Sequence, residues 1–296
     1  MYAFLCALAR FFSYLSRPQA LHLGSTFAGL LYGVYRLTPW RRLLQGHIHQ
    51  SFPSLSKKEQ DRIARQHVKT FLWAIVDFLR FWQWRQRHEG AVDLRSHQLP
   101  RHVLLVGDNH YQAAYGRGKG VILVSAHFGC WEYIPALSAL QGHPTTVLVQ
   151  KPAEPYFERL FTTFRGFAGV NTVNNDSYKG MGTLLRALRR QEVVGLVIDQ
   201  HGESEQLIGS LMGKTVSLPA GPGALARRTG AAVVPVFARW WGNQQIIEYL
   251  PARFYEQQDT DLSFTQALYD DIEKMIRKYP ENWLWSYNRW DKYTPS

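Results

Sequence analysis

The sequence predicts an α/β fold in which helices flank a mainly parallel central sheet, preceded by a helical, membrane-associating appendage. From residue 103 onward, short apolar runs alternate with segments of helical periodicity, a pattern typical of βαβ units. One of these runs, 121–125, leads through Ala126 into a histidine and then into a helix, as at the ligand-binding edge of an open sheet. Before residue 59 the chain is rich in apolar and aromatic residues and has no acidic residue.

Residues 1–50 form the predicted appendage, and residues 51–296 form the predicted α/β domain. The first 15 residues are apolar around Arg10, and a second apolar stretch, 20–35, is interrupted by His22 and Ser25. Neither stretch reaches the roughly 18 uninterrupted apolar residues of a clear membrane span. We therefore expect two amphipathic helices that lie on a membrane or pack as a hairpin. A short or tilted span and plain core packing are the alternatives.

The net charge of the 296-residue chain is +11, and its placement favours an anionic membrane surface. The first acidic residue is Glu59, and the arginines before it stand among apolar and aromatic residues. Nucleic acid would also suit the charge, but no nucleic-acid-binding motif is present; a simple gain in solubility is the other alternative. Cys6 and Cys130 are too few for a disulfide framework or a zinc site, which indicates a reducing compartment.

The α/β domain is predicted to open with a long helix. Ser56 and Glu59 have the spacing of a capping box, and apolar residues follow at helical spacing as far as about Gln86. The strands that we expect after this helix lie at 103–106, 121–124, 146–149, 193–198, 232–237 and 245–250. The helices between and after them lie at 130–140, 154–168, 178–190, 219–229 and 261–279. The tail, 279–290, is too aromatic for a disordered end.

The candidate active site is the turn after the second predicted strand. His127 follows the strand directly, and Glu132 stands five residues later, where a helix begins. On one continuous helix these two side chains would lie about 140° apart. With His127 in the turn and Glu132 in the first helical turn, the carboxylate can fold back to the imidazole. A base with an orienting acid is the minimum needed to deprotonate a hydroxyl.

Several motifs recur along the chain in a recognisable order. They are the segment 51–59 with its Phe-Pro pair, His127-Phe-Gly-Cys-Trp-Glu132, Gln150-Lys151-Pro152, Arg165, the strand ending in Asp199-Gln200, and the aromatic ending 280–290. Together they resemble the lysophospholipid acyltransferase superfamily and, within it, the bacterial late acyltransferases of lipid A biosynthesis. The resemblance covers nearly the whole chain. Cys130 stands where Asn is common in the wider group, Lys151 replaces Arg, and Tyr287-Asn288 replaces His-Arg.

The resemblance implies an O-acyltransferase that moves a fatty acyl group from acyl-CoA or acyl carrier protein to a hydroxyl of a membrane lipid. Lipid A precursors and lysophospholipids are the implied acceptors, and glycolipids and ornithine-type lipids stay open. The resemblance implies no bound cofactor and no metal. His127 would be the general base, oriented by Glu132, and Arg165 would donate to the carbonyl oxygen. Lys151 and Arg289 would hold phosphate on the lipid or carrier. Asp199, at the same sheet edge, would support the substrate site or act as a simple cap.

The implied location is the cytoplasmic face of a bacterial inner membrane, with the chain peripheral or spanning once. Two other readings of the residues stay open. Cys130 lies three residues from His127, so it could be the nucleophile of a thioesterase. A basic membrane-binding protein without catalytic activity is the second alternative.

Overall fold

The computed structural model describes residues 2–35, 37–38, 40–87, 102–150, 154–175, 178–200 and 207–290. The N-terminal helices are α1 (Tyr2–Tyr14), α2 (Arg17–Tyr35), α3 (Trp40–Ser51) and α4 (Lys57–Arg87). The later helices are α5 (Asp108–Tyr115), α6 (Tyr133–Leu140), α7 (Pro155–Phe167), α8 (Tyr178–Arg189), α9 (Gly221–Thr229) and α10 (Asp261–Lys278), with a short 3-10 turn, η1 (Pro280–Asn282). The strands are β1 (Val103–Val106), β2 (Val121–Ser125), β3 (Thr145–Val149), β4 (Val170–Asn174), β5 (Val193–Val197), β6 (Leu207–Leu211), β7 (Lys214–Leu218), β8 (Ala232–Trp241) and β9 (Gln244–Tyr249).

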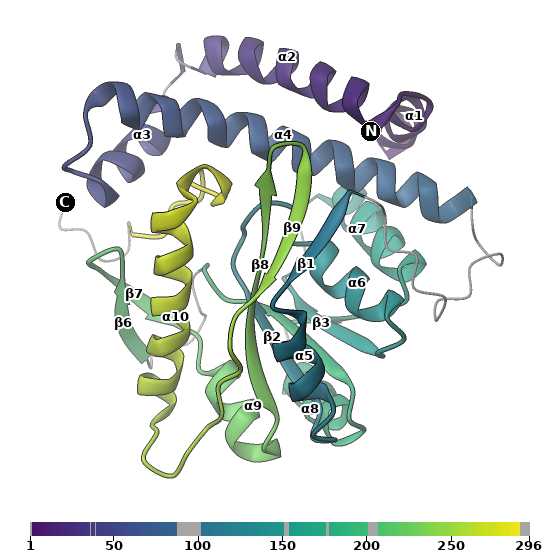
Figure 1. Cartoon of the computed structure of the whole chain (residues 1–296), viewed down its shortest axis with the longest axis vertical. Coiled ribbons are helices and arrows are strands. Elements are labelled where there is room, and N and C mark those ends of the chain that lie inside the picture. The colour runs from purple at the N-terminus through teal and green to yellow at the C-terminus, as the bar shows by residue number, and fades with distance from the viewer. Residues whose placement is uncertain are drawn as a thin grey trace.

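The central sheet has seven strands in the order β1-β9-β8-β2-β5-β3-β4. All neighbouring pairs in this sheet are parallel except the hairpin of β8 and β9, so the predicted mainly parallel α/β fold is confirmed. The strands β6 and β7 form a separate antiparallel pair. Helices cover both faces of the large sheet, as Figure 1 shows.

Strand β2 lies in the middle of the sheet and is buried on both faces, as a continuous apolar run in a parallel sheet should be. Val121 and Leu123 contact the core that includes α4, α5, α6 and α7. Ile122 and Val124 point to the opposite core, which includes α3, α8, α9 and α10. This alternation follows from the two-residue period of a strand, and it holds the end of β2 rigidly between two cores.

Helix α4 crosses the top of the sheet, and α1 and α2 lie on the side of α4 that faces away from it (Figure 1). The predicted capping box starts this helix, because the Ser56 amide donates to the Glu59 carboxylate at 2.8 Å and the Glu59 amide donates to the Ser56 hydroxyl at 3.3 Å. The N-terminal helices are fastened to α4 by a bidentate pair between Arg17 and Asp77, with N–O distances of 3.0 and 2.7 Å. The helical N-terminal part is thus present as predicted.

None of the helices in the described ranges combines the length and the apolar character that a bilayer-spanning segment needs.

The six predicted strands all occur, but the sequence reasoning missed α3, α5, β4, β6 and β7. Strand β4 is an edge strand with two valines among three polar residues, and its asparagines are residue types that strands rarely contain. The aromatic tail is ordered and buried, with Trp283 and Trp285 fully covered. Its backbone joins the turn after β2 through an isolated bridge between Phe128 and Trp283.

Candidate active site

Two neighbouring parallel strands bring His127 and Asp199 together. In β2 and β5, Ser125 pairs with Val197, and each chain runs two residues further to reach His127 and Asp199. The register therefore places these two residues opposite each other at the carboxyl edge of the sheet, where open α/β sheets bind ligands. The amide of Ile198 donates to the carbonyl of Ser125 at 3.0 Å, which continues the pairing to the edge.

His127 is held by Asp199 through two contacts. Its backbone amide donates to Asp199 Oδ1 at 3.1 Å, and its ring Nδ1 lies 2.7 Å from the same oxygen. A carboxylate oxygen that already accepts the amide proton is an acceptor, so it fixes the ring proton on Nδ1. Nε2 is then the nitrogen with a free lone pair. The His127 side chain is 20% exposed, which leaves its ring open to a substrate.

Asp199 is fully buried and binds two further donors through Oδ2. These are the indole N–H of Trp283 at 2.8 Å and Nη2 of Arg289 at 2.7 Å. Burial alone would raise the pKa of the Asp199 carboxyl, but the charges and hydrogen bonds of His127 and Arg289 hold it well below its usual range. Asp199 is therefore ionised at neutral pH, and it favours an imidazolium on His127 when the ring takes a proton.

A sharp turn carries the chain from His127 to helix α6. Gly129 has φ 54°, and a Cβ there would overlap the carbonyl of Ala238, so only glycine fits. Its amide donates to the Asn282 carbonyl at 2.8 Å, and the Leu284 amide donates to the His127 carbonyl at 2.9 Å. The C-terminal segment thus fixes the turn from outside the sheet.

The contact predicted between Glu132 and His127 is corrected by the structure. The Glu132 carboxylate binds Arg165 of α7 in a bidentate pair, with N–O distances of 2.9 and 2.5 Å. The ring next to His127 is that of Trp131, whose centroid lies 4.9 Å from the imidazole in an edge-on arrangement. Because Trp131 occupies this side of the histidine and Glu132 is turned towards α7, the acid that reaches the imidazole is Asp199.

Arg289 and Asp199 were both expected to contact substrate, but their described contacts are internal. The Arg289 side chain is 2% exposed, and it donates to Asp199 and to the carbonyls of Leu284 and Tyr287. Its guanidinium also stacks over Trp283, with its central carbon 4.1 Å from the ring centroid. In this state neither Arg289 nor Asp199 is open to a phosphate. Lys151, the other expected phosphate ligand, lies outside the described residues.

Cys130 is buried, and its Sγ lies 3.6 Å from the Ala74 carbonyl. Burial raises the pKa of this thiol well above its usual value, so it stays protonated at neutral pH. Nucleophilic cysteines are exposed enough to meet substrate and have a lowered pKa. The position and protonation of Cys130 therefore argue against the thioesterase alternative.

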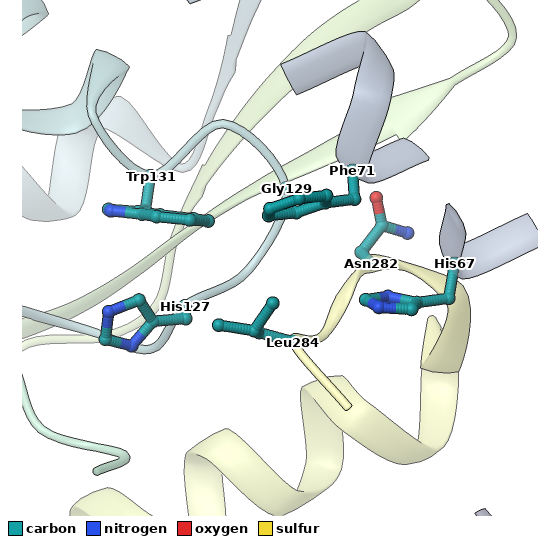
Figure 2. Close-up of a pocket in the computed structure, with 7 residues that line it drawn as sticks. All are labelled: His67, Phe71, His127, Gly129, Trp131, Asn282 and Leu284. Carbon is teal, nitrogen blue, oxygen red and sulfur yellow. The ribbon is translucent and has the colours of Figure 1, made fainter. Parts of the chain in front are cut away.

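A shallow pocket opens beside His127, with about 190 Å³ of empty space that includes open solvent. Its lining residues are His67, Phe71, His127, Gly129, Trp131, Asn282 and Leu284. Figure 2 shows the rings of Trp131 and Phe71 along one side of the pocket and His127, Leu284 and His67 along the other. Most of this space is open to solvent, and the enclosed part is about the size of one water molecule, so the described residues surround the position of a small reacting group and not that of a whole head group.

Sequence reasoning missed His67, Phe71 and Trp131 as pocket residues. On α4, His67 and Phe71 are part of an apolar helical stripe that reads as ordinary core. Trp131 was identified only as a member of the motif 127–132, without a role of its own. Asp199 was found, because it follows a predicted strand directly and so lies at the same edge of the sheet as His127.

Comparison with known proteins places the chain among lipid acyltransferases. It is 27% identical over 199 residues to a phosphatidylinositol mannoside acyltransferase of Mycobacterium tuberculosis, which covers 66% of this chain and 61% of that protein. The corresponding enzyme of Mycolicibacterium smegmatis is 23% identical over 224 residues, or 73% of this chain and 71% of that protein. The chain thus spans about three fifths of the length of the first of these relatives.

Among solved structures, the 1-acyl-sn-glycerophosphate (LPA) acyltransferase PlsC from Thermotoga maritima aligns with 91% of this chain and 100% of its own, at 11% identity and a TM-score of 0.42. The family described as bacterial lipid A biosynthesis acyltransferase matches residues 2–292. That match covers nearly the whole sequence, including the histidine turn, its acidic partner at the end of β5 and the aromatic tail. The chain belongs to the bacterial lipid A biosynthesis acyltransferase family.

Proposed function

We propose that this acyltransferase moves a fatty acyl group from a thioester, acyl-CoA or acyl carrier protein, to a hydroxyl of a membrane lipid, with His127 as the general base. The observation that carries the proposal is the pair of His127 and Asp199, with Nε2 left free beside the pocket. The relatives named above act on a mannosylated lipid. Their names favour glycolipids among the acceptors that the sequence leaves open.

In the proposed reaction, Nε2 of His127 takes the proton of the acceptor hydroxyl as its oxygen attacks the thioester carbonyl. The tetrahedral intermediate collapses by breaking the C–S bond, and the imidazolium returns the proton to the leaving thiolate. An ester and a free thiol result. A protein nucleophile is not needed, because a thiolate is already a fair leaving group. Asp199 keeps the proton on Nδ1 and stabilises the imidazolium between the two steps.

Backbone amides are the proposed donors to the carbonyl oxygen as its charge develops. The N–H groups of Cys130, Trp131 and Glu132 donate to no acceptor within the described ranges, and they lie in the turn between His127 and α6. Arg165, the side-chain candidate, already donates two hydrogen bonds to Glu132. We therefore propose that Glu132 and Arg165 act as a pair that holds α6, and with it these amides, against α7.

Purified protein with acyl-CoA or acyl carrier protein donors and a panel of lysolipids and glycolipids tests the proposal. Mass spectrometry should find an acylated acceptor, and His127→Ala should lower kcat by about 10²–10⁴-fold, the usual contribution of a general base. The variant should keep its fold, because the His127 side chain is partly exposed. Acyl transfer at the wild-type rate by His127→Ala would rule out this mechanism.

We also propose that α1 and α2 hold the protein at the cytoplasmic face of a bacterial inner membrane. The support is a set of apolar side chains that these helices leave about half exposed or more: Phe4, Phe11, Tyr14, Phe27, Leu30, Leu31 and Val34. This region has arginines and no acidic residue, so its positive charge suits anionic lipid. Charge attraction and burial of the apolar side chains both hold the protein on the bilayer, and salt weakens only the first. High salt should therefore release the protein only partly from phosphatidylglycerol vesicles.

A matched pair of substitutions tests the surface that binds the membrane. Leu30 on α2 is 64% exposed and Ile208 on β6 is 53% exposed, so replacing either by Asp should leave the fold intact. Leu30→Asp should weaken flotation with vesicles by about tenfold, since it removes buried apolar area and adds a like charge to the lipid. Ile208→Asp should float like the wild type. Equal effects of the two changes would contradict the assignment to α1 and α2.

A further inference from the structure

The C-terminal segment 282–289 contacts both members of the His127–Asp199 pair. The Leu284 amide donates to the carbonyl of His127 at 2.9 Å, and Figure 2 shows Leu284 beside that histidine. The indole N–H of Trp283 donates to Asp199 Oδ2 at 2.8 Å. One short stretch of chain therefore joins the ends of β2 and β5, although it belongs to neither strand.

Arg289, in the same segment, holds Asp199 by its backbone and by its carboxylate. Nε donates to the Asp199 carbonyl and Nη2 donates to Oδ2, each at 2.7 Å. Two bonds from one planar guanidinium to the main chain and the side chain of the same residue restrict the orientation of that carboxylate. The guanidinium is itself fixed, because it stacks over Trp283 and donates to the Leu284 carbonyl. Oδ1 is thereby turned to Nδ1 of His127.

Arg289 also balances the buried charge of Asp199. Both side chains are almost fully buried, so water screens their attraction little. Two further titratable groups face this pair, and both are uncharged at neutral pH. Burial raises the pKa of Tyr269 on α10 above its usual range, and burial and then the charge of Arg289 lower the pKa of His67 on α4 to about 4. The charge that changes during the reaction is that of His127.

We propose that Trp283 and Arg289 are positioning residues of the acyl transfer, which aim Asp199 at His127 and set the pH at which this pair takes up a proton. The inference rests on the proposed function, in which His127 must be free of that proton to act as the base. A positive charge beside the carboxylate makes proton uptake by the pair less favourable. Arg289 therefore extends the range in which the base is free towards lower pH.

The dependence of kcat/KM on pH tests the charge of Arg289. Dodecanoyl-CoA is the donor, and the acceptor is the lysolipid or glycolipid that the wild-type protein acylates fastest. Arg289→Met keeps an unbranched stem without charge, so the acid limb of the profile should move to higher pH by roughly one unit. The double variant with His67→Gln should show the same shift, which excludes His67 as its source.

Two conservative variants test the orientation of Asp199 apart from the charge. Arg289→Lys keeps the charge but replaces the two-pronged donor by a point charge, and Trp283→Phe removes the indole donor but keeps a ring under the guanidinium. In each, kcat should fall by about tenfold, the scale of a lost hydrogen bond to a charged group, while the acid limb keeps its position.

Arg253→Met is the control, because it breaks a partly buried ion pair with Asp271 outside the C-terminal segment. It should lower the unfolding temperature and leave the pH profile unchanged. If Arg289→Met lowers kcat/KM by one common factor at every pH, the inference is overturned while acyl transfer stands. Should that variant fail to fold, wild-type kcat in both Arg289→Lys and Trp283→Phe overturns it. Absence of transfer by the wild-type protein to every acceptor overturns the proposed function itself.

Discussion

Asp199 and Glu132 are both buried carboxylates at the same edge of the sheet, and each binds an arginine, yet only Asp199 also reaches a histidine. Glu132 turns both of its oxygens towards Arg165, and the ring of Trp131 lies beside the imidazole instead. Asp199 divides its oxygens between the histidine and the Trp283–Arg289 side. The acid 72 residues away is therefore the partner of His127, whereas the acid five residues away supports the scaffold.

Substitution of Asp199 should have the larger effect of the two. In Asp199→Asn, the amide can donate to Nδ1 and shift the ring proton to Nε2, so kcat should fall by about 10²–10⁴-fold. Arg289 also loses its charge partner, so the free energy of unfolding should drop by about 3–5 kcal/mol. Kinetics and urea unfolding measure the two effects. A variant with wild-type kcat would remove Asp199 from the mechanism.

Breaking the other pair should affect folding more than chemistry. Glu132→Gln leaves Arg165 unpaired at 15% exposure, so the protein should lose about 3 kcal/mol of unfolding free energy. The double variant Glu132→Met with Arg165→Met should recover most of that loss, since a buried ion pair can be replaced by apolar side chains. It should also keep kcat within about tenfold of wild type, because the amides of the turn are retained.

That double variant discriminates between the two roles of Glu132. Glu132 would have a catalytic role if it oriented His127 in the reacting state, or if Arg165 donated to the substrate there. In that case the double variant will recover its stability but have a kcat as low as that of Asp199→Asn. Thermal unfolding of the same samples provides the control. Recovery of both stability and activity would confirm that the pair supports the turn.

His67, His102 and Asp199 predict an acid-sensitive fold with two separate pH windows. His67 has a pKa of about 4 in the fold and about 6.5 in the unfolded chain, so the unfolded state binds more protons between these values and stability falls as pH decreases through this range. Through His67 alone, the free energy of unfolding should fall by about 3 kcal/mol between neutral pH and pH 4. Asp199 has a lowered pKa, so its contribution is complete above its unfolded value of 3.8 and is lost below it.

Unfolding free energies at pH 7, 5 and 3 check these windows. His67→Gln should flatten the curve between pH 6.5 and 4, and Asp199→Asn should flatten it below pH 4. His102, whose pKa burial lowers to about 4, adds to the first window and keeps some slope in the His67 variant. Identical slopes in all three proteins would show that these groups do not govern the acid limb.

The elements around the site could be predicted from sequence, but the partnership of its acids could not. The run that became β2 is continuously apolar and fully buried, and the run that became β5 is mostly buried, so both are easy to identify, and His127 and Asp199 were found at their ends. Local periodicity does not predict that β2 and β5 are neighbours in the sheet, because this order depends on the crossovers through α6, α7 and α8. Without that order, the nearer acid, Glu132, was the natural choice.

The pocket was harder to predict for a related reason. His67 and Phe71 share a helix face with residues that are simply core, and only the crossing of α4 over the sheet edge brings them to His127. The tail was recognised as ordered from its aromatic content. Its role in binding Asp199 through Trp283 depends on a bridge to Phe128 that no local pattern encodes.

The smallest effect should come from Cys130, which lies between His127 and Glu132 in sequence but is buried away from solvent. Cys130→Ser replaces Sγ by a hydroxyl that can keep the contact with the Ala74 carbonyl, so kcat should stay within about twofold of wild type. The loss of unfolding free energy should be about 1 kcal/mol, the usual scale for a small change in a packed core. Acyl transfer and thiol-alkylation rates on the same samples measure both points. Rapid alkylation of Cys130 itself in the folded protein, located by peptide mass and so distinguished from Cys6, or a kcat that collapses in Cys130→Ser, would show that the turn opens during the reaction and would restore Cys130 as the nucleophile.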